Sequence, residues 1–152
     1  MAQLFPKYVE EEENERIMAP ISKFEVENAL KTMQKDKSSG SDGWTVEFFQ
    51  HFFDLFGEEI VGVVEESRIR GFIHEPFNTT FLAVIPKADS PASFEDFRPI
   101  SLCNCIYKII AKTIAIRLKP ILLATSQKNS LAFWMAGKFM KLLGWPKNQC
   151  TV

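Results

Sequence analysis

The sequence predicts an α+β fold that is mostly helical and carries a small β-sheet. Three observations lead to this prediction. Apolar side chains recur every three or four residues between 22 and 70, which is the spacing of helices that bury one face. An apolar, β-branched run at 79–85 predicts a buried strand, and residues 100–102 predict a short second strand. A further periodic stretch at 105–118 predicts a last helix.

Length and composition are those of a soluble globular domain. The chain has 152 residues, of which 46% are hydrophobic and 24% charged, enough for one core. The N-terminus lacks the pattern of a signal peptide, and no apolar run approaches the length of a membrane span. The chain has three cysteines, Cys103, Cys105 and Cys150. Their number is odd and their spacing is not that of a zinc site, so we expect reduced thiols. We therefore expect an intracellular protein, cytoplasmic or nuclear, that does not bind a membrane.

Charge is divided unevenly along the chain, although the net charge is only −1. Residues 1–75 carry eight Lys or Arg and sixteen Asp or Glu, whereas residues 76–152 carry ten and three. No acidic residue follows Asp96. A basic C-terminal half suits a polyanionic partner; the alternative is that the two halves pack together and partly neutralise each other.

The first forty residues predict a disordered segment, a helix and a loop. Segment 1–20 is predicted to be disordered, because its consecutive glutamates repel one another and its prolines interrupt a helix. Ser22 and Glu25 have the spacing of a capping box, which predicts a helix from 22 to about 35. The Ser- and Gly-rich stretch that follows predicts a loop, or a small anion nest, but not a nucleotide P-loop.

Two helices are predicted between residues 44 and 70. The first carries six aromatic residues at helical spacing, and we expect Gly57 to cap it. These residues are Trp44, Phe48, Phe49, Phe52, Phe53 and Phe56. A packing role in the core is favoured over base stacking, because helical periodicity is mainly a packing signal. The second helix should end at Gly71.

Two cations flank the loop that joins the predicted strands. The first strand ends at Lys87, and Arg98 begins the return after a polar loop. A lysine and an arginine held on a rigid scaffold suggest an anion site, with phosphate as the expected ligand. The alternative is that both cations simply pair with Asp89, Glu95 or Asp96.

The last predicted helix has a basic face. We expect Asn104 to cap its start and Pro120 to close it. Its cations are Lys108, Lys112, Arg117 and Lys119. They are candidates for a nucleic-acid contact, and a face that is merely solvated explains the same pattern.

Several blocks of the sequence resemble reverse transcriptases of non-long-terminal-repeat (LINE-type) retrotransposons, especially plant elements. Residues 37–43, KSSGSDG, resemble the block K-A-P-G-P-D-G, and 81–87 resemble the strand that ends in I-P-K. Residues 94–104, FEDFRPISLCN, resemble F-x-x-F-R-P-I-S-L-x-N, and 115–122 resemble A-N-R-L-K-P-x-L. The blocks occur in the family's order over about 21–123, which leaves 124–152 as a divergent C-terminal tail.

This resemblance implies a fingers-type subdomain, an incomplete reverse-transcriptase fold. In the family, the cations at Lys87 and Arg98 hold the triphosphate of the incoming nucleotide. The partners of the intact enzyme are an RNA or DNA template and deoxynucleotides, and its Mg²⁺ is held by aspartates of a palm. Those aspartates have no counterpart in this chain. The resemblance therefore implies no catalytic residue, no metal or other cofactor, and no polymerase activity for the chain by itself.

Two alternatives from other functional classes remain open. The chain could be a weak RNA- or nucleotide-binding module that uses its basic half, with salt-sensitive affinity. It could also be a helical interaction protein without a catalytic role, which uses the aromatic segment 44–56 as a contact surface.

Overall fold

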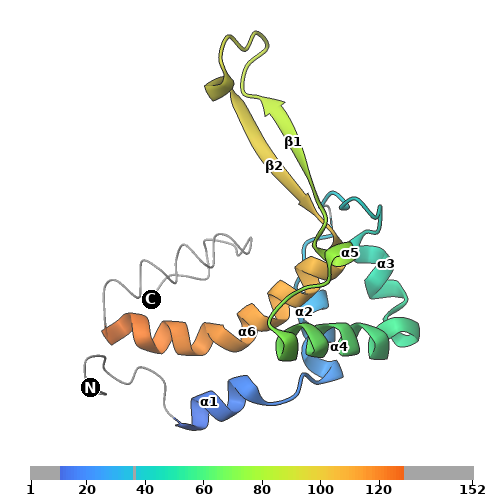
Figure 1. The fold of residues 1–152 in the computed structure, drawn as a ribbon, viewed down its shortest axis with the longest axis vertical. Helices are drawn as coiled ribbons and strands as arrows, with labels where there is room; N and C mark the ends of the chain where they lie inside the picture. Colours follow the sequence, from blue (N-terminus) through green and yellow to red (C-terminus); the bar gives the residue numbers. More distant parts are fainter. Residues whose placement is uncertain (1–10, 36, 129–152) are drawn as a thin grey trace. The chain divides into compact units, whose positions relative to one another are not determined.

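The computed structural model describes residues 11–35 and 37–128, with side chains described through residue 123. The chain forms two compact units. One comprises residues 22–110, and the other combines the residues up to Ile21 with those from Ala111 onward. Helices predominate, and the described residues form one two-stranded antiparallel sheet (Figure 1). The predicted α+β class is confirmed.

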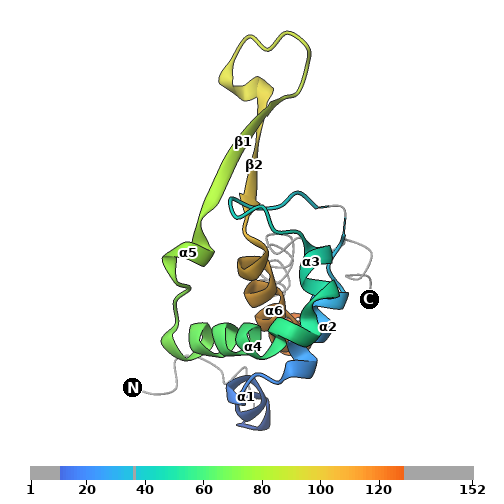
Figure 2. The ribbon, with the colours of Figure 1, turned by 90° about the vertical axis from the view of Figure 1, so that its right-hand side faces the viewer.

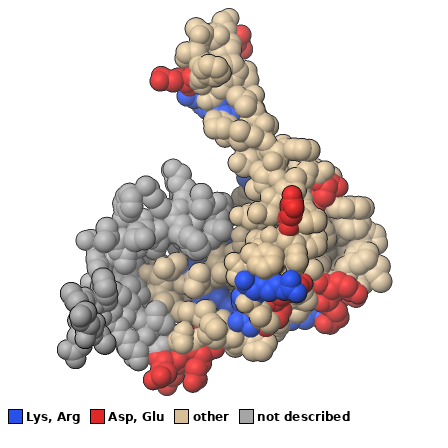
Figure 3. Space-filling view, in the orientation of Figure 1, with Lys and Arg blue, Asp and Glu red and all other residues tan. Residues whose placement is uncertain are grey.

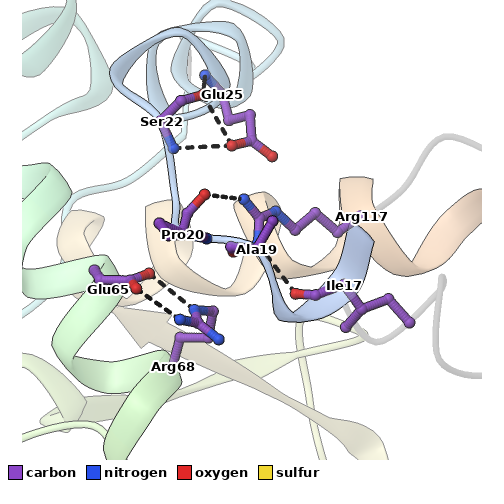
Figure 4. Close-up of polar contacts among 8 residues, drawn as sticks. All are labelled: Ile17, Ala19, Pro20, Ser22, Glu25, Glu65, Arg68 and Arg117. Carbon is purple, nitrogen blue, oxygen red and sulfur yellow. Dashed lines mark hydrogen bonds and ion pairs between the residues drawn. The ribbon is translucent and has the colours of Figure 1, made fainter. Parts of the chain in front are cut away.

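Three helices build most of the first unit: α2 (Lys23–Lys31), α3 (Val46–His51) and α4 (Phe53–Arg70). They pack on one another, and α2 begins with the predicted capping box. The Ser22 backbone N–H donates to the Glu25 carboxylate at 2.9 Å, and the Glu25 N–H donates to the Ser22 hydroxyl at 3.3 Å (Figure 4). The core is apolar and consists of Val26, Ala29, Leu30, Val46, Phe49, Phe53, Ile60, Val64, Cys105, Ile109 and Ile110.

The aromatic segment breaks at Phe52 and not at Gly57, where the sequence predicted a cap. Gly57 is buried inside α4. A Cβ atom there would lie 2.9 Å from Cε of Lys23 and 3.3 Å from the Phe53 ring, so this glycine permits close packing. The end of α4 is as predicted: Gly71 adopts the left-handed conformation with φ 70°.

A β-hairpin follows the short helix α5 (Glu75–Asn78). Strand β1 (Thr80–Pro86) pairs antiparallel with β2 (Phe97–Cys103), so that Thr80 lies opposite Cys103 and Ile85 opposite Arg98. The connecting loop contains the 3-10 helix η1 (Phe94–Asp96). In both ribbon views the hairpin extends away from the helices of its unit (Figures 1 and 2).

The first strand is exposed, which corrects the prediction of a buried strand. Phe81, Leu82, Val84 and Ile85 are between 47% and 64% exposed. The hairpin has only two strands, and no third layer among the described residues covers its faces. The apolar run correctly indicated a strand, but a run of this kind does not reveal whether anything packs on it.

The last helix, α6 (Cys105–Lys128), corrects the prediction that Pro120 closes it. Proline inside a helix removes one backbone hydrogen bond and costs about 3 kcal/mol. Ala115 and Ile121, on either side of the proline, are nevertheless buried, so packing outweighs that cost. Within the part of the chain that is described, no helix is long and apolar enough to cross a membrane.

A helix also forms where the sequence predicted disorder. Residues Glu11–Met18 of the predicted disordered segment 1–20 form α1, and residues 1–10 lie outside the described part. Three glutamates occupy its first turn and Arg16 its last turn, an arrangement that favours a helix through its dipole. The predicted disorder was based on the repulsion among the glutamates and left out their favourable interaction with the helix dipole. The predicted tail 124–152 is described only as far as Lys128, where α6 ends.

Candidate functional site

The hairpin brings Lys87 and Arg98 to neighbouring positions near its far end. Arg98 lies opposite Ile85, and Lys87 follows Ile85 by two residues, which places both cations on one face. The Lys87 N–H donates to the Asp96 carbonyl at 2.7 Å and continues the pairing past the strand end. The two cations are thus diagonal neighbours, which in antiparallel pairs lie roughly 7–8 Å apart.

The two cations differ in their partners. The Lys87 ammonium donates to the backbone carbonyl of Glu95. The Arg98 side chain is exposed and makes no hydrogen bond or ion pair with any residue that the structure describes. Neither cation pairs with the carboxylate of a loop residue in this part of the chain, so the alternative of simple ion pairing is not observed. Arg98 is therefore available to an external anion.

The loop between the cations is shaped by Asp96. Its carboxylate accepts the N–H of Ala92 at 2.9 Å and the N–H of Ser93 at 3.0 Å. These backbone donors hold the pKa of Asp96 below its ordinary value, because they stabilise the ionised form. The carboxylate thereby folds the loop into the turn that presents the Glu95 carbonyl to Lys87.

Charge on the hairpin is concentrated near its far end. In the space-filling view, Lys, Arg, Asp and Glu atoms gather there, and the middle of the hairpin shows uncharged atoms (Figure 3). The exposed apolar side chains of β1 account for much of that middle part. An anion that reaches the hairpin would therefore meet its cations only at the far end.

The four cations of α6 do not form one free basic row. The Lys108 ammonium donates to the Ser38 carbonyl at 3.0 Å within the first unit. In the second unit, Lys112 and Lys119 lie two turns apart. Burial lowers the pKa of Lys112, and the positive charge of Lys119 lowers it further. Both of these lysines have partners. A nucleic-acid contact by these residues stays a prediction.

Arg117, the fourth of these cations, binds backbone carbonyls at the C-terminal end of α1. Its guanidinium donates to Ile17 at 3.1 Å, to Pro20 at 2.7 Å and also to Ala19 (Figure 4). Carbonyls at the end of a helix lack intrahelical donors, and a cation there also favours the helix dipole. This contact gives Arg117 a structural role within its unit.

Asn104 organises the base of the hairpin, a role that the sequence did not indicate. It is only 3% exposed and directly follows β2. Its side-chain oxygen accepts the Ser41 hydroxyl at 2.9 Å and the Asp42 N–H at 3.3 Å, and its NH₂ group donates to the Pro76 carbonyl at 3.0 Å. Asn104 directly precedes α6, and its backbone carbonyl accepts the Lys108 N–H at 3.2 Å, so it occupies the predicted cap position. Its side chain, however, forms a three-way link between the 37–43 loop, α5 and the start of α6.

Gly40 completes this link. A Cβ atom on Gly40 would lie 2.3 Å from the side-chain oxygen of Asn104 and 2.5 Å from the Cα of Asn104. Any larger residue at position 40 would therefore clash with Asn104 unless the backbone moved. Two N–H groups of the loop already have partners inside the chain, since Asp42 donates to Asn104 and Gly43 to Gly40. The loop therefore serves packing against Asn104, and these two amides are not turned toward an anion.

The described residues contain no group of three or more His, Cys, Asp or Glu side chains that could hold a metal ion. Cys105 is buried, and burial raises the pKa of its thiol to about 12, so it is not a nucleophile at neutral pH. Lys87 and Arg98 remain the exposed cations of the predicted anion site.

Comparison with known proteins links the chain to a mobile element. No family model matches it. The uncharacterized 149 kDa protein of transposon TX1 from Xenopus laevis is 38% identical to it over 114 residues. The match covers 75% of this chain but 9% of the TX1 protein, so the chain spans only a small part of that relative's length. The chain is therefore related to a transposon protein.

Proposed function

We propose that this chain is part of the reverse transcriptase, an RNA-directed DNA polymerase, of a non-long-terminal-repeat retrotransposon. Lys87 and Arg98 would bind the triphosphate of the incoming nucleotide. The relation to a transposon protein and the ordered motif blocks support the assignment. The observation that carries the site is the exposed, unpaired Arg98 on the same hairpin face as Lys87.

The two side chains suit a triphosphate for different reasons. The planar guanidinium of Arg98 can form two parallel hydrogen bonds to phosphate oxygens, and the Lys87 ammonium adds a mobile point charge. Lys87 would exchange the neutral Glu95 carbonyl for an anionic oxygen, which is a stronger acceptor. Both groups face water, so we expect weak binding that is sensitive to salt.

The chain by itself is expected to bind and not to catalyse. In the proposed family, Mg²⁺ and the aspartates that hold it activate the primer hydroxyl, and the fingers only position the nucleotide. The purified chain should therefore incorporate no nucleotide into a primed template with Mg²⁺ or Mn²⁺. Detectable incorporation would contradict this expectation.

The proposal is tested by titrating the 152-residue chain with a fluorescent deoxynucleoside triphosphate and following anisotropy. Arg98→Ala should weaken binding about tenfold, which corresponds to about 1.4 kcal/mol. Lys87→Ala should have a smaller effect, because its ammonium must first leave Glu95. Lys31→Ala is the matched control, since Lys31 pairs with Glu27 on α2, away from the hairpin.

Two outcomes would overturn the proposal. One is a triphosphate affinity that Arg98→Ala leaves unchanged, and the other is an affinity that does not fall as salt rises. A nucleoside without phosphates should not compete. A short single-stranded RNA serves as a further competitor: if it binds far more tightly than the triphosphate and depends on the same two cations, the RNA-binding module is the better description.

A further inference from the structure

A second surface lies on the helical part of the same unit, far in sequence from the hairpin cations. Trp44, Phe52 and Phe56 are 49%, 41% and 37% exposed, although the sequence predicted a core role for this segment. Phe48 joins them, with ring centroids 4.2 Å from Trp44, 5.0 Å from Phe52 and 6.2 Å from Phe56. Only part of the predicted aromatic face, including Phe49 and Phe53, is buried.

The four rings form a continuous row along α3 and the start of α4. They recur every fourth residue, and Leu55 of α4 is also exposed, at 67%. A monomeric protein rarely leaves several large apolar side chains in mutual contact at its surface without a binding function. We call this row, with the acidic residues described next, the aromatic–acidic surface.

The stretch of sequence that carries the rings is acidic. Residues 38–67 contain seven Asp or Glu and no Lys or Arg. Three of these acids are exposed on the same two helices: Glu47, Asp54 and Glu59. None of the three makes an ion pair with a residue that the structure describes. No described cation therefore neutralises these carboxylates.

We propose that the aromatic–acidic surface binds a basic amphipathic helix of a partner protein. Apolar side chains of that helix would pack between the exposed rings, and its Lys or Arg residues would pair with the carboxylates of Glu47, Asp54 and Glu59. A cation above the Trp44 ring adds a favourable interaction of about 0.5–1 kcal/mol at an exposed site. An apolar helix face laid on an apolar surface is a common mode of peptide recognition.

The charge excludes other occupants. Nucleic acid and anionic lipid both carry negative charge, and the unpaired carboxylates would repel them. A second copy of the chain that used the same surface would bring like charges together across a two-fold axis, which is also unfavourable. A basic partner is the class that satisfies both the apolar and the acidic components. The inference does not rest on the proposed triphosphate site.

The test uses the 152-residue chain and a designed 18-residue helical peptide of Leu and Lys, with all the leucines on one face. Isothermal titration calorimetry should detect binding that weakens as salt rises. The same peptide with Glu in place of Lys should bind at least about tenfold more weakly. Phe56→Ser should weaken binding of the Lys peptide about tenfold, because it removes one of the four rings of the row.

Matched variants on the hairpin distinguish binding at this surface from non-specific binding of the peptide. Glu59→Lys should weaken binding of the Lys peptide, whereas Glu95→Lys, an equal charge change in the hairpin loop, should not. Phe94 is 98% exposed in the same loop, so Phe94→Ser controls for loss of an exposed ring. Equal binding of the Lys and Glu peptides would overturn the proposal. The proposal would also be overturned if Phe56→Ser and Phe94→Ser weakened binding equally. Self-association of the chain that Phe56→Ser abolishes would overturn it as well.

Discussion

Replacing Asn104 by alanine tests the most heavily connected polar group of the hairpin base. The substitution removes the acceptor for the Ser41 hydroxyl and the Asp42 N–H, which lie at 2.9 and 3.3 Å. It also removes the donor to the Pro76 carbonyl at 3.0 Å. Since Asn104 is 3% exposed, the substitution leaves a cavity, and the former partners of Asn104 lose their hydrogen bonds.

The expected cost follows from these three contacts. A hydrogen bond contributes about 1 kcal/mol net to stability, and a buried group left without a partner costs about 1–3 kcal/mol. The Asp42 contact is long, and the loop can partly rehydrate, so we expect a loss of about 2–3 kcal/mol in the free energy of unfolding. Small domains have only about 5–15 kcal/mol in total, so this loss is easily measured.

Urea denaturation followed by circular dichroism measures this loss. A slope of about 1–3 kcal/mol per molar urea converts it to a decrease in midpoint of about 0.7–3 M, with the slope unchanged. Asn78→Ala is the matched control, because Asn78 is exposed and its side chain makes no hydrogen bond with a described residue. We expect the control to change stability by less than about 0.5 kcal/mol. Equal midpoints for the two variants would refute the role assigned to Asn104.

Two further predictions concern Arg117 and the thiols. Arg117→Ala should speed hydrogen exchange in α1, because it removes the donors to the Ile17 and Pro20 carbonyls. Arg117→Lys should retain part of the protection. Equal exchange rates in the two variants would contradict the capping role. At pH 8 iodoacetamide should modify Cys103 well before Cys105, as measured by mass spectrometry, because burial raises the pKa of Cys105 from 9.0 to about 12. The unfolded thiol ionises first, so the contribution of Cys105 to stability is present below pH 9 and is lost as the pH rises toward about 12.

Local chemistry made several elements predictable. The capping box at Ser22 and the left-handed Gly71 act through their own backbone neighbours, and both appear where the sequence indicated. The positions of Lys87 and Arg98 at the two ends of one loop also follow from order along the chain. Alternation of side chains then places them on one face of the hairpin.

Features that depend on distant packing were predicted poorly. Gly57 looked like a cap but lies under the side chain of Lys23, a neighbour from another helix. Pro120 looked like a helix end, yet buried residues on both sides hold the helix through it. Asn104 precedes the last helix as predicted, but the partners of its side chain are separated from it by 28 to 63 residues. A short stretch of sequence does not contain both members of these contacting pairs.

The sequence by itself determined the mostly helical α+β class, the existence of the strands, the uneven charge and the two cations beside the loop. These follow from periodicity, residue type and chain order, which are local. Only the tertiary structure decided that the hairpin is exposed, that Arg98 forms no ion pair with a described residue, and that part of the aromatic segment faces outward. Burial and pairing are properties of contacts between segments, and the same apolar pattern suits a covered or an uncovered surface.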